Sequence, residues 1–279
     1  MFNNSVSLTS LLTAAARAKE SASPYALITD PFAEILSGEH GKCILEKAGE
    51  DFIAIVAVRT KYFDNIIENA VSRGISQFIS LGSGLDSRPY RLSFLPSSGR
   101  WFELDYKSVL EYKKRILEAT NSQQLIPVTY VPCNILNVNL TQHLVTNGLD
   151  VKKPTLLIIE GVIYYLTLVQ ADSLLKKISN AFLTLSAPFE ILFDASDKEL
   201  NKPNFYTRQI LELLNSLNTP LIFEGIDEPK NFIRNYGFIP KEIVFLGHKN
   251  AHYGRLSFGP YKILPQGYPT SWFIHCYGN

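Results

Sequence analysis

The sequence predicts an α/β protein with a mostly parallel seven-stranded sheet, helices on both faces and an antiparallel edge near the C-terminus. Three observations support this prediction. Short apolar segments alternate with helical segments between residues 77 and 217. The first apolar segment ends in a turn with two glycines, and in parallel sheets such strand ends are where ligands bind. Two strand-like segments with no helix between them close the chain.

The first 75 residues have mainly helical patterns. Residues 10–19 are rich in alanine, and the apolar residues of 51–72 recur at the spacing of one helix face. Asp51 could cap the start of the second helix, and Gly74 follows its end. We therefore expect a helical N-terminal cap.

No linker rich in Pro, Gly or Ser separates this cap from the remaining residues. We therefore expect a single domain over residues 1–279, in which residues 1–75 form the cap and residues 76–279 form the core.

The core pattern alternates between strands and helices. Strands are expected at 77–81, 100–105, 128–133, 155–160, 189–194, 242–246 and 271–277, and helices at 107–119, 168–183 and 203–217. A helix between successive strands is typical of parallel pairing. The last two strands have no helix between them, which indicates an antiparallel edge.

Composition narrows the class of protein. The net charge of +1 provides no basic field for nucleic acid, and no apolar run approaches the ~20 residues of a membrane span. Three scattered cysteines indicate a reducing compartment. The N-terminus has no pattern of a signal peptide, so a cytoplasmic location is expected. The five histidines lack metal-ligand spacing, so no metal site is expected.

The turn after the first strand carries the strongest chemical signal. Gly82 and Gly84 allow the backbone to approach a ligand closely. Asp105 ends the second strand about 20 residues later, where an acid can accept hydrogen bonds from a ribose diol. Together they predict a nucleoside ligand.

Charge indicates which nucleoside. A dinucleotide site would favour a third glycine at position 87 and a neutral loop for the pyrophosphate. The chain has Ser87 there, and Asp86 would repel phosphates. S-adenosyl-L-methionine has no phosphate and carries a sulfonium and an ammonium group, which Asp86, Asp105 and Glu160 would attract. A nicotinamide-dependent reductase is the first alternative.

These motifs and their neighbours resemble the leucine carboxyl methyltransferase-like family, which includes polyketide carboxyl methyltransferases. The resemblance covers about residues 20–195 and rests on these stretches: Asp30-Pro31-Phe32-Ala33, Val58-Arg59-Thr60-Lys61-Tyr62-Phe63-Asp64, Leu81-Gly82-Ser83-Gly84-Leu85-Asp86-Ser87-Arg88-Pro89-Tyr90-Arg91-Leu92, Phe102-Glu103-Leu104-Asp105, and Ile159-Glu160-Gly161-Val162-Ile163-Tyr164-Tyr165-Leu166. It implies a class I methyltransferase (Rossmann-like) fold and an S-adenosyl-L-methionine-dependent O-methyltransferase activity.

The resemblance also implies roles for individual residues. Arg59 resembles the arginine that reaches the cofactor carboxylate, and Gly82 the loop glycine against the methionine moiety. Asp105 matches the ribose acid, and Glu160 the acid near the cofactor amino group. Where the family usually has Asp-Leu against the adenine ring, this chain has Asn134-Ile135. Asn can still accept a hydrogen bond from the adenine amino group through its carbonyl oxygen.

The remaining candidates concern the methyl acceptor. Tyr164 and Tyr165 lie where family members line the transfer site, and either could face the core instead. Tyr62 lies three residues after Arg59 on the same helix face and could close the pocket or pack in the core. Arg88, like Arg91, could hold a substrate carboxylate or pair with Asp86 or Glu103.

Within this interpretation a carboxylate acceptor needs no general base, whereas a phenol or alcohol would need one that the sequence does not reveal. The acceptor is expected to be a carboxylic acid, either of a small molecule or polyketide or of a protein C-terminus. The cap is expected to roof its pocket, with residues 248–270 as another wall. A non-catalytic family member that only binds the cofactor is the second alternative, and the oligomeric state is not indicated.

Overall fold

The computed structural model describes residues 7–183, 186–202, 207–255 and 270–278. One seven-stranded sheet has the strand order β3-β2-β1-β4-β5-β7-β6. The strands are β1 (Gln77–Leu81), β2 (Arg100–Asp105), β3 (Val128–Pro132), β4 (Thr155–Ile159), β5 (Phe189–Ser196), β6 (Ile239–Phe245) and β7 (Ser271–Tyr277). Strands β1 to β5 pair in parallel, and β7 is antiparallel to both β5 and β6. The predicted fold class is confirmed.

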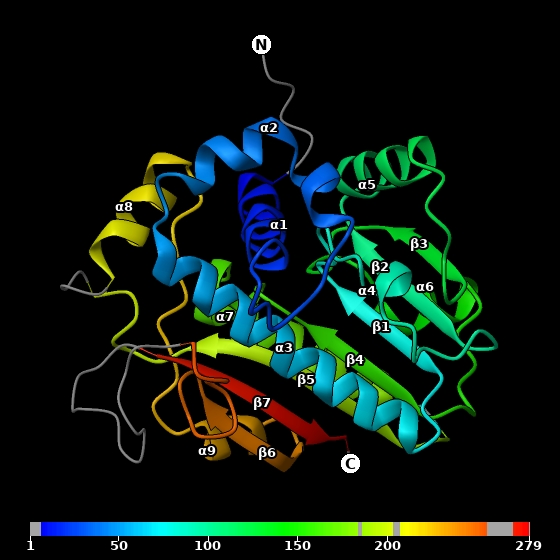
Figure 1. Cartoon of the computed structure of the whole chain (residues 1–279). Coiled ribbons are helices and arrows are strands. Elements are labelled where there is room, and N and C mark those ends of the chain that lie inside the picture. Colours follow the sequence, from blue (N-terminus) through cyan, green and yellow to red (C-terminus); the bar gives the residue numbers. More distant parts are fainter. Residues whose placement is uncertain (1–6, 184–185, 203–206, 256–269, 279) are drawn as a thin grey trace.

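Helices cover both faces of this sheet and one of its ends (Figure 1). In the described part of the chain they are α1 (Leu8–Ser21), α2 (Ala33–Leu45), α3 (Glu50–Ser72), α4 (Arg88–Arg91), α5 (Lys107–Ala119), α6 (Leu140–Thr146), α7 (Leu168–Phe182), α8 (Arg208–Ser216) and α9 (Pro229–Arg234), with a 3₁₀ turn η1 (Ile163–Tyr165). The short helices α4, α6 and α9 were not predicted, because four to seven residues show too few turns for a periodic pattern.

Several predicted boundaries shift in the structure. Strand β6 runs from Ile239 to Phe245, so it begins three residues earlier than the strand expected at 242–246. Its pairing with β7 has a register shift between Pro240 and Glu242. The helix expected over 203–217 runs from Arg208 to Ser216, and residues 203–206 lie outside the described part.

The ends of α3 show one correct and one wrong prediction. Gly74 follows the helix with a φ of 89°, a conformation that suits glycine. The prediction that Asp51 caps the start is wrong, because the helix begins one residue earlier and its cap is Gly49, with a φ of 82°. Asp51 lies in the first turn instead, where a negative charge favours the helix dipole.

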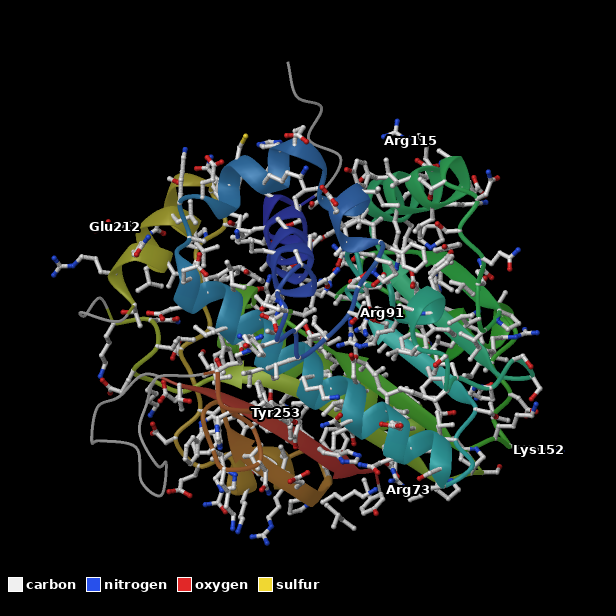
Figure 2. All side chains as sticks on the ribbon, viewed as in Figure 1. Arg73, Arg91, Arg115, Lys152, Glu212 and Tyr253 are labelled. Carbon is white, nitrogen blue, oxygen red and sulfur yellow. The ribbon has the colours of Figure 1, made fainter. Side chains whose placement is uncertain are left out.

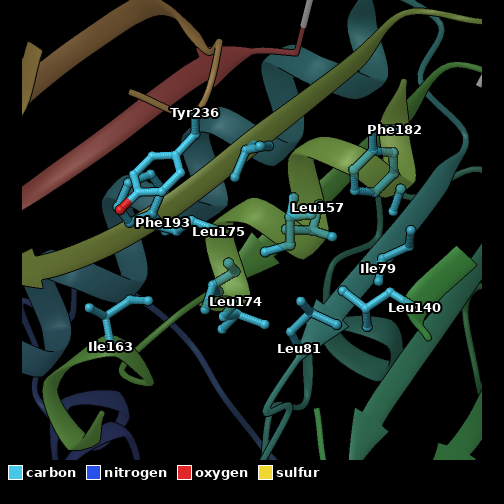
Figure 3. Packing of buried hydrophobic residues seen from close by; sticks show 14 of the residues in the cluster. Ile79, Leu81, Leu140, Leu157, Ile163, Leu174, Leu175, Phe182, Phe193 and Tyr236 are labelled. Carbon is cyan, nitrogen blue, oxygen red and sulfur yellow. The ribbon is translucent and has the colours of Figure 1, made fainter. Parts of the chain in front are cut away.

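Alternation along the strands produces two apolar layers. On one face, Ile79 and Leu81 of β1 and Leu157 of β4 pack against Leu174 and Leu175 of α7, all of them buried (Figure 3). The strand residues between them, Phe78 and Leu156 among others, point to the opposite face and pack against α3. Both faces of the sheet are therefore covered by apolar side chains, as is usual for parallel strands.

The N-terminal helices lie across the carboxyl ends of the parallel strands, with α1 at the centre and α2 above it (Figure 1). Arg17 of α1 donates a hydrogen bond from Nη2 to the carbonyl oxygen of Leu85, at 2.7 Å. The cap is thus fastened directly to the turn that follows β1. Among the described residues, no helix combines the length and apolar character needed to cross a bilayer.

At the opposite end of the sheet, a charged cluster joins its antiparallel edge to α3. The buried carboxylate of Glu190 on β5 contacts Nη2 of Arg73, Nζ of Lys241 and Nε2 of His275, at 2.6, 3.1 and 2.6 Å. Burial alone would raise the pKa of Glu190, but hydrogen bonds from His275, Lys241 and Arg73 lower it to about 2. The ionised carboxylate therefore links β5, β6, β7 and the end of α3.

This cluster predicts a pH dependence. Because the folded-state pKa of Glu190 lies below its usual 4.5, its contribution to the free energy of unfolding is complete above that pH and is lost as the pH falls toward about 2. We expect Glu190→Gln to lower the free energy of unfolding at neutral pH by roughly 2 kcal/mol and to flatten the loss below pH 4.5.

Urea unfolding across this pH range measures both effects. The exposed pair partner Glu118 provides the matched control, since Glu118→Gln should change neither quantity noticeably. An unchanged acid profile in Glu190→Gln would contradict the assigned ion pairs.

Candidate functional site

The turn after β1 adopts a backbone conformation that suits glycine. Gly82 has a φ of 65°, and its N–H donates to the carbonyl oxygen of Leu104 at 2.8 Å. A Cβ at Gly82 would lie 2.6 Å from Cγ2 of Val162. Gly84 has a φ of 51°, and its Cβ would lie 3.0 Å from Oγ of Ser10 on α1. The loop therefore fits closely between the segment after β4 and the cap.

Asp105 ends β2 beside this loop. Its Oδ2 accepts the N–H of Gly84 and its Oδ1 accepts the N–H of Tyr106, both at 2.7 Å. Burial raises the pKa of Asp105 in spite of these two hydrogen bonds. Each carboxylate oxygen can accept a second hydrogen bond, so the group remains available to a ribose diol. Asp105 does not itself line the cavity described next.

A cavity extends from this loop beneath the cap. One part, here called the polar end, is lined by the loop and by charged side chains: Gly82, Ser83, Gly84, Asp86, Arg59, Arg88 and Glu160. The other part, here called the apolar end, is lined by Leu12, Phe52, Ile210, Leu214 and Leu221. Tyr164 and Tyr165 also line the cavity, and α1 contributes Thr9 and Thr13.

The polar end rests on a continuous chain of buried ion pairs, here called the ion network. It consists of Arg17, Asp30, Arg91, Asp64, Arg88, Asp86, Glu160, Arg59 and Asp194. Arg88 is its centre: Nε donates to Asp64 at 2.6 Å, and Nη1 lies 3.0 Å from Asp86 and 2.7 Å from Glu160. Arg91 lies inside the molecule, whereas Arg115 and Glu212 lie at its periphery (Figure 2).

The network contains four arginines and five carboxylates. With all of them ionised, one negative charge remains in excess. Burial alone would raise the pKa of Asp86, but Arg88, Lys113 and Arg91 lower it to about 2. The polar end therefore has the charge balance to accept a ligand with a net positive charge.

Asp194, two residues before the end of β5, was not predicted as a site residue. Its carboxylate is fully buried and accepts three hydrogen bonds. Oδ1 accepts the N–H of Gly161 at 2.7 Å, and Oδ2 accepts from Tyr164 Oη at 3.0 Å and from Arg59 Nη1 at 3.3 Å. Asp194 thus fixes the turn after β4 together with Arg59. Its position at the end of the strand expected at 189–194 was the available signal.

The two tyrosines of η1 differ in their surroundings. Burial and the neighbouring Asp194 raise the pKa of Tyr164 well above its usual range. Burial also raises the pKa of Tyr165, although Arg59 and Thr9 act in the opposite direction. Both hydroxyls therefore stay protonated at neutral pH. Tyr164 is further held by its carbonyl oxygen, which accepts the N–H groups of Ile222 and Phe223.

Four predicted site residues do not line the cavity: Asp105, which ends β2, and Tyr62, Asn134 and Ile135. The ring of Tyr62 stacks on Phe273 at 4.9 Å, and its hydroxyl donates to Glu242, so it packs in the core. Asn134 and Ile135 follow β3 outside the cavity lining. The side-chain oxygen of Asn134 accepts the N–H of Leu136 at 3.0 Å.

Arg88 lines the cavity but is held by acids rather than free to reach a substrate. Of its two expected structural partners, Asp86 is confirmed, whereas Glu103 pairs with Lys113 at 2.6 Å. The remaining nitrogen of Arg88, Nη2, is buried and has no hydrogen-bond partner among the described residues. The same holds for Thr60 Oγ1 and Ser83 Oγ, both on residues that line the cavity. Unpaired buried polar atoms are destabilising, so this wall has capacity for a polar ligand.

The sequence model of the leucine carboxyl methyltransferase family matches residues 10–179. The chain belongs to this family. The match includes the glycine loop, Arg59, Arg88 and Glu160, but ends before Asp194 and α8.

Curated relatives agree with this assignment. A candidate S-adenosyl-L-methionine-dependent methyltransferase from Mycobacteroides abscessus is 34% identical over 194 residues, covering 63% of this chain and 61% of the relative. Another from Mycolicibacterium paratuberculosis is 35% identical over 176 residues, covering 58% of each chain. The chain spans about three fifths of the length of these relatives.

Solved structures share the fold at low identity. A DUF574 family protein from Streptomyces avermitilis has a TM-score of 0.59 at 12% identity, covering 96% of this chain and 97% of that one. A candidate methyltransferase from Thermobifida fusca has a TM-score of 0.58 at 13% identity, covering 98% and 96%. Magnesium protoporphyrin IX methyltransferase from Synechocystis, solved with bound SAH, reaches 0.50 at 10% identity, covering 81% and 85%.

The close contact at Gly82 generates a stability prediction. Gly82→Ala combines a positive φ, unfavourable by about 1–2 kcal/mol for an L-residue, with a clash against Val162. Gly237 has a φ of 76°, and a Cβ added there would meet nothing within 4 Å, so it is the matched control for φ alone. We expect Gly82→Ala to lower the free energy of unfolding more than Gly237→Ala does.

In a Val162→Ala background the difference should disappear, because only the backbone strain remains. Urea unfolding of the four variants measures this. Equal destabilisation by both glycine substitutions in the native background would contradict the close approach.

Proposed function

We propose that this protein is an S-adenosyl-L-methionine-dependent O-methyltransferase that methylates the carboxylate of a small molecule. Family membership supports the methyl-transfer chemistry. The observation that favours a carboxylate over a phenol or alcohol is that the described lining residues include no histidine, while raised pKa values keep Tyr164 and Tyr165 protonated.

The polar end fits the cofactor in charge and in hydrogen-bonding capacity. S-adenosylmethionine carries a sulfonium, an ammonium and a carboxylate, and so a net positive charge that matches the excess carboxylate of the ion network. Its polar groups would supply partners for Thr60 Oγ1, Ser83 Oγ and Arg88 Nη2, which are unpaired among the described residues.

Individual roles follow from position. Arg59 would bind the cofactor carboxylate and Glu160 its ammonium, since both side chains reach the cavity at the end of β4. Gly82 and Gly84 would let the backbone approach the methionine moiety, and Asp105 would accept the ribose hydroxyls. Asp86 would hold the loop to Arg88 and add negative charge.

The adenine position is proposed from the neighbouring ends of β2 and β3. Asn134 and Ile135 lie at the end of β3, next to β2 and Asp105. We propose that they border the adenine ring there, beyond the lining of the cavity.

When bound, S-adenosylmethionine would supply an electrophilic methyl group to a carboxylate oxygen of the acceptor, with the electron pair of the broken C–S bond left on sulfur. No proton moves, because the acceptor is already ionised at neutral pH. The chain's own residues then contribute alignment and exclusion of water. Alignment of two bound groups can supply ~7–11 kcal/mol of the barrier reduction.

Cysteine usage and net charge bear on the compartment and on the class of acceptor. The free thiols of Cys43, Cys133 and Cys276 favour a reducing compartment, so we place the protein in the cytoplasm. The near-neutral net charge gives no support for nucleic acid as acceptor. The expected wall at 248–270 lies largely outside the described residues, although Thr270 lines the cavity.

A binding experiment tests the cofactor. Calorimetry with S-adenosylhomocysteine should give a dissociation constant for the native chain, and Asp105→Asn should weaken it about tenfold or more, because hydrogen bonds to a charged group contribute about 1.5–3 kcal/mol. Glu111→Gln removes an exposed acid on α5 and should leave binding unchanged. No heat with the native chain, together with heat from NADH, would overturn the proposal in favour of a reductase.

Asp194 generates a second binding prediction. Asp194→Asn removes the buried charge that holds Arg59, so the affinity for S-adenosylhomocysteine should fall about tenfold, whereas Tyr164→Phe, which removes only one hydrogen bond to Asp194, should reduce it less. Calorimetry on both folded variants measures the order. The reverse order would contradict the positioning role of Asp194.

A further inference from the structure

We infer that the methyl acceptor is a carboxylic acid with a long aliphatic chain, and that the apolar end of the cavity holds this chain. The inference rests on the proposed function for the acid group and goes beyond it in naming the body of the substrate. It is carried by the side chains of α1, α3 and α8.

The apolar end lies where these three helices meet. Leu12 and Leu214 are 1% and 4% exposed, and they belong to one apolar cluster with the half-buried Phe52, Ile210 and Leu221. The same five side chains also border the cavity. Leu12 and Leu214 are therefore almost fully packed already, whereas Phe52, Ile210 and Leu221 still expose apolar surface that a ligand in the cavity would bury.

The chemistry of these side chains excludes a polar body for the acceptor. A sugar, an amino acid or a nucleotide would leave its hydroxyl or amide groups without partners against this wall, which is unfavourable by roughly 1–3 kcal/mol for each group. An aliphatic chain has no such groups. An aromatic ring would gain most from ring partners, and among the described residues of the apolar end only Phe52 provides one.

The two ends of the cavity are continuous, so a single amphiphile can place its acid near the cofactor and its chain away from it. Thr9 and Tyr165 line the same cavity and have neutral hydroxyls that can donate to a carboxylate, whereas the hydroxyl of Thr13 donates to the carbonyl oxygen of Ser10. This arrangement keeps the charged group at the polar end and the methylenes among leucine and isoleucine side chains.

The family relationship points to the same division. The polar end comes from residues within the match to the family, 10–179, whereas Ile210, Leu214 and Leu221 lie beyond it. Three of the five side chains of the apolar end therefore lie outside the matched range, whereas the polar end lies within it.

Chain length provides the direct test. Calorimetry with the native chain saturated with S-adenosylhomocysteine would compare butanoate, hexanoate, octanoate and dodecanoate. We expect the affinity to rise about fourfold for each methylene, the fold change that corresponds to about 0.8 kcal/mol per buried CH₂. Affinities independent of chain length, or benzoates that bind better than alkyl acids of equal carbon number, would overturn the inference.

Two variants locate the chain. Ile210→Gln and Leu221→Gln place amides on half-buried positions of the apolar end, so each should lower dodecanoate affinity about tenfold or more while leaving S-adenosylhomocysteine affinity unchanged. Val169→Gln is the matched control, since Val169 is 77% exposed on α7 and does not line the cavity. Retained dodecanoate affinity in both cavity variants would overturn the assignment of the chain to this wall.

The two proposals fail in different ways. If S-adenosylhomocysteine does not bind but dodecanoate does and responds to Ile210→Gln, the methyltransferase function is overturned and the chain-binding site stands. If S-adenosylhomocysteine binds and only short polar acids accept the methyl group from a radiolabelled donor, the function stands and the aliphatic acceptor is overturned.

Discussion

The arrangement of the site depends on the buried charge of Arg88. A buried guanidinium is stable only when acids surround it, and three carboxylates from different parts of the chain do so: Asp64 from α3, Asp86 from the glycine loop and Glu160 from the end of β4. Each of these contacts ties a separate element to the same point. The loop, the long helix and the sheet therefore have fixed relative positions at the cavity.

The network continues in both directions from this centre. Through Arg91 and Asp30 it reaches Arg17 of α1, which also donates to the loop, so the cap is attached to the same set of charges. On the other side, Glu160 leads through Arg59 to the buried Asp194. The family motif residues Asp30, Arg59 and Asp64 thus have a shared structural role in addition to any contact with a ligand.

The sequence located most of the polar end for physical reasons that operate locally. A glycine pair after a buried strand and an acid one strand later are signals within short stretches, and Gly82, Gly84 and Asp105 meet as predicted, with Gly84 bound to Asp105. Charge reasoning from single residues was incomplete. Asp86 is not a free acid that repels phosphate, because Arg88 pairs with it, and the negative character arises from the excess carboxylate of the whole network.

By itself, the sequence determined the alternation of strands and helices, the antiparallel edge, the glycine loop and the strand-end acids, because each depends on the period and residue types of a short segment. The tertiary structure alone decided which charges neutralise one another, that Tyr62 packs on Phe273 instead of in the cavity, and that Asp194 orients Arg59 from 135 residues away. It also brought α8 against α1 and α3 to form the apolar end. Such pairings depend on how distant segments meet in space, and local sequence patterns do not contain that information.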